Sequence, residues 1–271
     1  MKTIWQDLRY AARMLWKTPG FTIVAVLSLA LGIGANTAIF SFVNAVLLRA
    51  LPITEPERLV FVFSSTQAAP YSVAPYPDYV DYRNRNKVFS ELTAYSGITV
   101  SLNNNEGAEQ ISGLIVSGNY FDVLGVRASA GRTFSPEEDQ TPGAHPVVII
   151  SHGLWRKRFA GDANVIGKQL LLNGQTFNIV GVAPAGFDGA EAGQTTDIYV
   201  PMMMQAVVRP PRSGYSGEMN PDLLSVRRNG WVNMIGRLKP GVSFEAAQTE
   251  MNVLAKQLAD AYPDTNRGES A

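Results

Sequence analysis

The sequence predicts an α+β protein with one N-terminal transmembrane helix, preceded by an amphipathic helix and followed by a larger folded region. The run Phe21–Leu48 contains no Asp, Glu, Lys or Arg, which helps to explain why only 17% of the chain is charged. Soluble domains usually carry about 25%. Residues 49–271 alternate short apolar runs with helical patterns, and they are numerous enough for one or two folded domains.

Charge and cysteine content exclude several kinds of function. The 271 residues carry 23 basic and 23 acidic side chains. This balance lacks the basic surplus of nucleic-acid-binding proteins, so we expect no nucleic-acid partner. The absence of cysteine excludes a disulfide-stapled fold, a Cys-ligated zinc site and a cysteine nucleophile.

The charge-free run is long enough to cross a membrane. As a helix, Phe21–Leu48 would be roughly 42 Å long, more than the ~30 Å hydrocarbon core requires. A cleaved signal peptide is the alternative, but its apolar region is usually about 7–15 residues long. The residues after the run offer no clear cleavage site. We therefore expect an uncleaved transmembrane helix.

The segment before this run is basic and amphipathic. Residues 1–20 hold four basic residues against one acid, Asp7, and the positive-inside rule then predicts a cytoplasmic amino terminus. Apolar residues recur at helical spacing, as in a helix lying on the inner membrane face. We expect Thr18-Pro19-Gly20 to separate the two helices. The topology-setting basic residues are Lys2, Arg9, Arg13 and Lys17.

Four small or polar residues share one face of the predicted transmembrane helix. At 100° per residue, Gly34, Thr37, Ser41 and Asn44 fall within an arc of about 80°. Such a stripe favours contact with other membrane helices, although small residues are common in any such helix. The sequence has no second apolar run of this length. The partner helices would belong to another chain or to a part of the protein absent here.

Residues 49–271 predict a mixed pattern in which strands outnumber helices. Asn173-Gly174 suits a type I′ hairpin turn, Ser151 and Ser243 suit helix caps, and residues 205–230 favour a long loop. An apolar stripe from Phe244 to Leu258 is expected to face the core. We expect strands at 59–63, 96–102, 110–116, 146–150, 170–172, 176–182, 197–200 and 231–238, and helices at 77–86, 119–124, 152–159 and 243–262.

Nothing in this region has the spacing of a catalytic, cofactor or metal site. The two histidines, His145 and His152, lack carboxylates at metal-ligand spacing, and Ser151 beside His152 is not a nucleophile–base arrangement. Glu137-Glu138-Asp139 is interpreted as a solvated turn, with a weak divalent-ion site as the alternative. Met202-Met203-Met204 favours packing over an adaptable binding surface. A P-loop is absent from the sequence, so we expect no ATP hydrolysis by this chain and no cofactor.

Several sequence blocks occur in a recognisable order. Ala30–Asn36 lies in the apolar run, and Pro56–Leu59, Val116–Phe121, Gly131–Phe134, Ser151–Trp155, Gly181–Pro184 and Arg237–Ser243 follow. Together they resemble the amino-terminal part of MacB/FtsX-type ABC transporter permeases, especially the duplicated acidobacterial type, with a MacB-like periplasmic core domain. The likeness covers nearly the whole chain. The family's second membrane block, of three helices, is not in this sequence.

The resemblance implies an organisation. It implies a cytoplasmic amphipathic helix over 1–20, a transmembrane helix over 21–48 and an extracytoplasmic core domain over 49–271. Within that domain it implies a porter-like half at about 52–113 and 227–271 and an inserted, strand-rich subdomain at about 114–226. The location would be the bacterial inner membrane, in a single pass.

The resemblance also implies a role and partners. The chain would be a permease subunit or permease fragment that couples ATPase-driven motion to a docking domain in efflux or export. Its partners would be an ABC ATPase subunit, further permease helices or a second permease copy, and a periplasmic adaptor. A signal-anchored extracytoplasmic ligand-binding or sensor module, without a transport role, is the alternative.

Overall fold

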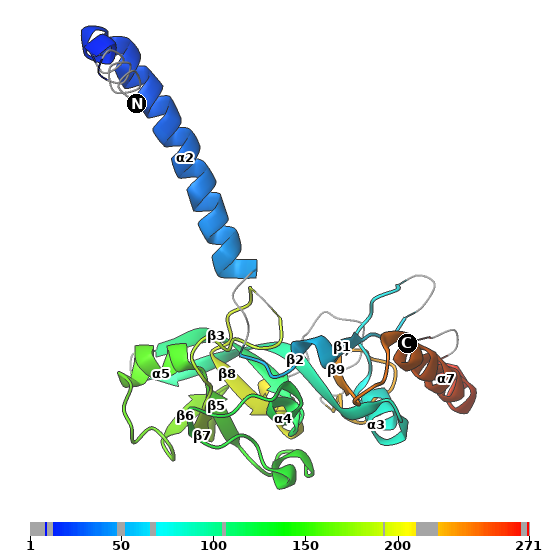
Figure 1. Cartoon of the computed structure of the whole chain (residues 1–271). Helices are drawn as coiled ribbons and strands as arrows, with labels where there is room; N and C mark the ends of the chain where they lie inside the picture. Colours follow the sequence, from blue (N-terminus) through cyan, green and yellow to red (C-terminus); the bar gives the residue numbers. More distant parts are fainter. Residues whose placement is uncertain are drawn as a thin grey trace. The chain divides into compact units, whose positions relative to one another are not determined.

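A computed structural model of the 271-residue chain forms two compact units, residues 1–50 and 51–271 (Figure 1). The structure describes residues 9, 13–47, 52–65, 69–104, 107–191, 193–209, 222–266 and 270. The two units are considered separately below.

The first unit contains the expected long helix, α2 (Pro19–Leu47). It starts two residues before the expected boundary because Pro19, which lacks an amide hydrogen, fits a first helical position. Of the three residues expected to separate the helices, only Thr18 is non-helical, and its carbonyl accepts the Thr22 amide at 3.1 Å. Pro19 and Gly20 belong to α2. The stretch Pro19–Thr37 is long and apolar enough to cross a membrane. Most of the expected amphipathic helix, including Lys2, lies outside the described residues.

The second unit is built on a mixed nine-stranded sheet with the main order β1-β9-β2-β3-β8-β5-β7-β4, while β6 pairs with β2 and β7. The strands are β1 (Leu59–Val62), β2 (Phe89–Asn104), β3 (Gly107–Val116), β4 (Ala130–Gly131), β5 (Val147–Ile150), β6 (Gln169–Leu172), β7 (Gln175–Val182), β8 (Ile198–Pro201) and β9 (Asn233–Leu238). The helices are α3 (Tyr76–Arg85), α4 (Tyr120–Leu124), α5 (His152–Phe159), α6 (Gln205–Val208), α7 (Phe244–Ala261) and α8 (Pro263–Asn266), with 3-10 turns η1 (Pro56–Arg58), η2 (Pro136–Asp139) and η3 (Met202–Met204).

At one end of the sheet, strands from the beginning and the end of the domain sequence lie side by side. β9 lies between β1 and β2 and is antiparallel to both, with Arg237 opposite Leu59 and Ile235 opposite Thr93. β1, α3 and β2 therefore form a β-α-β unit whose two parallel strands are separated by β9. Figure 1 shows α3 and α7 at this end of the domain. Arg85 donates to Gln257 of α7 at 2.8 Å.

The other end of the sheet contains parallel pairs, β3 with β8 and β5 with β7. The β6–β7 hairpin is as expected, because Asn173 and Gly174 both have positive φ, at 49° and 82°, as a type I′ turn requires. The strand expected at 96–102 is longer, since β2 starts at Phe89 and its first half pairs with β9. The division into a porter-like half and an inserted half stays a prediction.

Two apolar clusters form the core. The larger one joins the inner faces of α3 and α7 to the sheet and includes Tyr79, Leu92 and Met251. The smaller one is largely aromatic, with Phe121 5.1 Å from Tyr199 and 5.8 Å from Phe187 between ring centroids. Aromatic pairs at these separations add to the stability gained from burial alone. Met202–Met204 are buried, which agrees with the packing interpretation.

Both expected helix caps are present. Ser151 Oγ accepts the Leu154 amide at 3.1 Å, and Ser243 Oγ accepts the Ala246 amide at 3.2 Å.

Two local expectations were wrong. Phe244 is 57% exposed, although Met251 and other members of the same stripe are buried. The segment expected to be a loop from residue 205 begins with helix α6; residues 210–221 are outside the described part.

The acidic cluster at η2 is not the solvated turn expected from its composition. Glu138 is 5% exposed, and its carboxylate binds Arg132 Nη2 at 2.7 Å and the Ser135 amide at 2.8 Å. Ser135 and Glu138 thereby form a capping box, and only Glu137 of the three acids is fully exposed. Desolvation by burial raises the pKa of Asp139 to about 6, although the Gly118 amide hydrogen-bonds to it.

The raised pKa of Asp139 predicts a pH-dependent loss of stability. A carboxyl whose folded pKa exceeds its unfolded pKa favours folding when protonated, so this contribution is lost between about pH 4 and 6. Asp139→Asn should therefore leave unfolding free energy unchanged near pH 4 and raise it by about 2 kcal/mol at pH 7.5. Urea titration of the detergent-solubilised chain measures this, with Glu137→Gln as the exposed control. An equal effect of Asp139→Asn at both pH values would contradict the assignment.

A buried ion pair links α3 to the C-terminal part of the domain. The Asp78 carboxylate is 2% exposed and binds Arg227, which also lies 2.8 Å from Asp81. Asn266 donates to the other Asp78 oxygen at 2.7 Å, and the Arg227 guanidinium stacks 3.8 Å from the Tyr262 ring. Burial raises the pKa of Asp78 despite these partners. Loss of either charge would leave its partner buried without compensation, which typically costs about 3–5 kcal/mol.

Candidate functional site

The residues considered for catalysis do not form a reactive group. His145 and His152 are half-buried, and the His152 ring packs edge-on against Trp155 at 5.3 Å. Within the described ranges, there is no group of three or more His, Asp or Glu side chains that could hold a metal ion.

The sequence-predicted membrane residues are all in or before α2. Arg9, Arg13 and Lys17 are exposed. Gly34 and Thr37 are also exposed, and a Cβ added at Gly34 would meet no atom within 4 Å. This side of α2 is therefore open. The side chains of Ser41 and Asn44 lie outside the described residues, although their backbone belongs to α2.

A cluster that the sequence did not predict fastens the first described residues of the domain, 52–58. Arg237 of β9 donates through Nε to the Val123 carbonyl at 2.8 Å and through Nη2 to the Thr54 carbonyl at 2.6 Å. Its Nη1 is 3.3 Å from the Glu55 carbonyl. One guanidinium thus binds backbone from two distant segments. Charge-assisted donors of this kind make stronger hydrogen bonds than neutral ones.

Further contacts hold the same segment. The Thr54 amide donates to the Leu124 carbonyl at 3.0 Å, and its hydroxyl donates to the Gly125 carbonyl at 3.0 Å. Arg58 donates through Nη2 to the Leu238 carbonyl at 2.6 Å. We call Thr54, Arg58, Gly125 and Arg237 together the Arg237 latch. Gly125 has φ of 67°, and a Cβ there would lie 2.5 Å from the Thr54 side chain, so a glycine is required.

The latch also holds an unfavourable backbone conformation. Glu55 adopts φ of 46° and ψ of 60°, the left-handed region that costs a non-glycine residue about 1 kcal/mol or more. Its carboxylate lies 2.6 Å from Arg58 and 3.6 Å from Arg237. A strained turn persists where surrounding contacts over-determine it. Residues 52–58 therefore follow the path set by the domain.

The latch holds the first described residues of the second unit. Only residues 48–51 separate α2 from the segment that the latch holds. Within the second unit, Arg237 links residues 54–55 to β9 and to the end of α4. The site is made of polar hydrogen bonds to backbone carbonyls and contains none of the residues considered for catalysis.

Comparison with known proteins assigns the family. Residues 22–254 match the model of the MacB-like periplasmic core domain. The chain belongs to this family. It is 27% identical over 180 residues to the macrolide export ATP-binding/permease protein MacB of Escherichia coli K12 and to that of Shigella dysenteriae. The match covers 66% of this chain and 24% of each relative, so the chain spans about a quarter of their length.

Solved structures show the same fold for the MacB-like domain. The periplasmic region of MacB from Actinobacillus actinomycetemcomitans aligns with a TM-score of 0.54 at 15% identity, covering 77% of this chain and 86% of that one. The extracellular domain of the ABC-type transporter YknZ from Gram-positive bacteria aligns with a TM-score of 0.52 at 18% identity, covering 78% and 96%. The resemblance stated from the sequence blocks is thereby confirmed, as is the α+β class.

The latch of this MacB-like chain predicts a local effect of mutation. Arg237→Gln removes the guanidinium bonds to Thr54 and Val123, so amide exchange in residues 52–58 should accelerate at least tenfold and unfolding free energy should fall by about 2 kcal/mol. Hydrogen-exchange mass spectrometry and urea unfolding measure the two. Arg228→Gln, at an exposed arginine, is the control and should change neither. Unchanged exchange in residues 52–58 would show that Arg237 does not hold them.

Proposed function

We propose that this chain is a membrane-anchored permease subunit, or part of one, in a MacB-type ABC transporter. The match over residues 22–254 supports this most directly, because it includes most of α2 together with the extracytoplasmic domain. The domain would consist of a porter-like half and an inserted half. The transporter would drive efflux or export, with ATP hydrolysis on a partner subunit.

The proposed topology places residues 1–20 in the cytoplasm and 49–271 outside the bacterial inner membrane. Lys2, Arg9, Arg13 and Lys17 precede the apolar helix, and basic residues beside a span favour the cytoplasmic side. The chain contains no cysteine. A single cysteine introduced near Lys2 or in the domain would therefore report the side of the membrane without background.

The proposed mechanism is mechanical. ATPase-driven motion would move α2, and the Arg237 latch would carry that motion to β9 and α4. The latch suits this role because Arg237 binds Thr54, which lies just after α2 in sequence, and Val123 at the end of α4. The moving domain would then act on a periplasmic adaptor.

The proposed membrane partners are further permease helices or a second permease copy, together with an ABC ATPase subunit. Gly34, Thr37, Ser41 and Asn44 would form the contact face, because small residues let helix backbones approach closely. Gly34 and Thr37 are exposed on α2 and available for such a contact.

Gly34→Leu tests the proposed contact face. The larger side chain should block close approach and reduce recovery of other permease helices and of the ATPase at least fivefold, as measured by quantitative mass spectrometry after affinity purification from native membranes. Gly32→Leu is the matched control, because Gly32 lies about 160° around the helix from Gly34 and has equally open space.

Three outcomes can be distinguished. Loss of partners with Gly34→Leu but not with Gly32→Leu supports the contact face. Equal recovery with both variants would contradict the face while retaining the transporter proposal. A wild-type chain that copurifies with neither an ATPase nor membrane helices would contradict the transporter proposal itself and favour an anchored binding module.

A further inference from the structure

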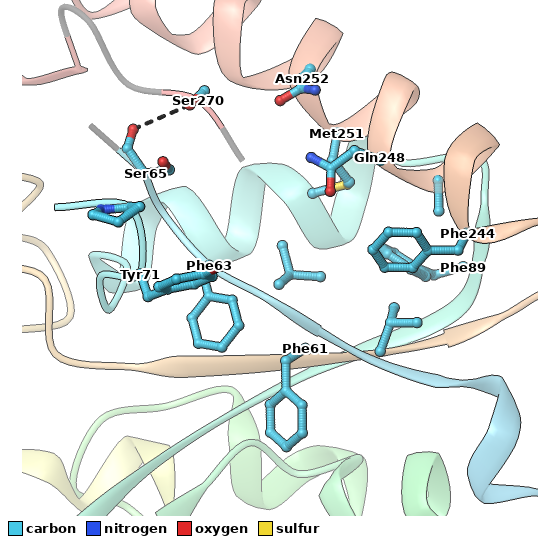
Figure 2. Close-up of a pocket in the computed structure, with 14 residues that line it drawn as sticks. Phe61, Phe63, Ser65, Tyr71, Phe89, Phe244, Gln248, Met251, Asn252 and Ser270 are labelled. Atoms are coloured by element: carbon cyan, nitrogen blue, oxygen red, sulfur yellow. Dashed lines mark hydrogen bonds between the residues drawn. The ribbon is translucent and has the colours of Figure 1, made fainter. Parts of the chain in front are cut away.

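Two parts of the domain differ in their charged groups. A groove between β1 and α7 is lined by uncharged residues only, and Figure 2 shows Phe61, Phe89 and Phe244 among them. Turn η2, in contrast, has three acids in four residues. Asp139 is the one that packs against residues 117–119, the segment between β3 and α4. Asp139 is therefore the candidate for a contact that depends on pH.

Turn η2 lies between two fixed points of the chain. Before it, Phe134 is buried in the smaller core cluster. After it, the Gly143 amide donates to the Met203 carbonyl at 2.8 Å. Residues 135–142 thus form a short segment that can leave the domain surface while both of its ends stay in place.

Asp139 packs tightly on residues 117–119. The Gly118 amide hydrogen-bonds to its carboxylate. A Cβ added at Gly118 would lie 2.8 Å from the Asp139 Cβ, so this close approach requires a glycine. Ser117 is itself fastened to β2, because its Oγ accepts the Ala94 amide at 3.1 Å. Asp139 therefore docks η2 on a backbone segment that is held in place.

The contact leaves one carboxylate oxygen without a partner. Asp139 Oδ1 is shielded from solvent, and nothing in the described part of the chain hydrogen-bonds to it. An ionised carboxylate loses its hydration at such a position without replacement, whereas a neutral carboxyl loses much less. Burial accordingly raises the pKa of Asp139 to about 6. The docked position suits the protonated acid better than the ionised one.

The titratable groups around Asp139 do not offset this cost. From α3, Arg83 favours the ionised form, and the phenols of Tyr76 and Tyr79 interact with the same carboxylate. Neither residues 117–119 nor η3 contains a titratable side chain. Desolvation outweighs the attraction of Arg83. The titratable groups on the side of η2 itself are Arg132, Glu137, Glu138 and His145.

We propose that Asp139 is a proton-dependent fastener of η2. When protonated, it keeps η2 docked on residues 117–119. When ionised, its carboxylate moves into solvent and residues 135–142 open between their two fixed points. This device does not depend on any transport role.

The size and direction of the effect follow from the two environments of the carboxyl. In the open turn the group is solvated and its pKa returns to the ordinary value of 3.8, against about 6 when docked. The docked turn is therefore favoured at low pH and loses this advantage as the pH rises from about 4 to 6. The opening equilibrium constant can increase by up to about 100-fold over this range.

Hydrogen-exchange mass spectrometry of the detergent-solubilised full chain tests the proposal. After correction for intrinsic rates, residues 117–119 and 135–140 should lose at least tenfold in protection between pH 4.5 and 7.5. Asp139→Asn imitates the protonated acid and should abolish this pH dependence, with folding checked by circular dichroism. A pH dependence that persists in the folded Asp139→Asn chain would overturn the proposal.

Two variants control for the other titratable groups of the turn. Glu137→Gln removes an exposed acid, and His145→Gln removes a histidine, a residue type that also titrates near this range. Both should retain the loss of protection between the two pH values. Its disappearance in either variant would assign the titration to a group other than Asp139.

Arg83→Gln provides an independent variant. It removes the cation that favours ionised Asp139, so the midpoint of the loss of protection should move to higher pH. An unchanged midpoint would contradict the assignment to Asp139.

Low concentrations of urea distinguish local opening from global unfolding. Local opening exposes little surface, so exchange of residues 135–140 should hardly respond to urea at pH 7.5. Residues 92–95 of β2, which are buried in the middle of the sheet, are the reference for global unfolding. Exchange of residues 135–140 that accelerates as steeply with urea as that of residues 92–95 would exclude a local fastener.

Discussion

The domain depends on the insertion of β9 between β1 and β2. These strands come from opposite ends of the domain sequence, so neither β1 nor the first half of β2 has its sheet partner until residues 233–238 are in place. The same event brings Arg237 to Thr54 and Val123. In the chain, β9 directly follows the segment that contains Arg227, the ion-pair partner of Asp78. β9 is followed by α7, which packs on the larger core cluster. Contacts this distant in sequence make folding slow but bind the two ends of the domain into one unit.

This constraint links the fold to the proposed function. In the proposed mechanism, motion of α2 would pass through residues 52–58 and Arg237 to β9. Because Arg237 is on the strand that pairs with both β1 and β2, the latch connects that segment to the end of the sheet that these three strands form. The family match over residues 22–254 includes most of the apolar helix and most of this domain. The polar, backbone-directed character of the latch suits force transmission better than ligand chemistry.

Local features of this fold could be predicted from the sequence, and long-range ones could not. The caps at Ser151 and Ser243 and the turn at Asn173-Gly174 depend on neighbouring residues, so their patterns identified them. The local composition around Glu138 and Asp139 is typical of a solvated turn. In the structure, however, Arg132 packs against Glu138 and the segment at Gly118 packs against Asp139. Arg237 lies in one of the sequence blocks that carry the family resemblance, but the sequence predicted no role for it. Its hydrogen-bond partners lie more than 100 positions away in the chain. Only the three-dimensional structure brings these groups together.

The most direct test of coupling through the latch is a distance measurement between α2 and the domain. Spin labels at Leu31→Cys and Gln110→Cys, both exposed positions in a cysteine-free chain, would report this distance by pulsed electron resonance in nanodiscs with the copurified ATPase. The account predicts that ATP binding shifts the distance distribution to a second narrow peak, and that Arg237→Gln broadens it without a defined shift. The same ATP-dependent shift in both proteins, or none in the wild type, would contradict coupling through Arg237.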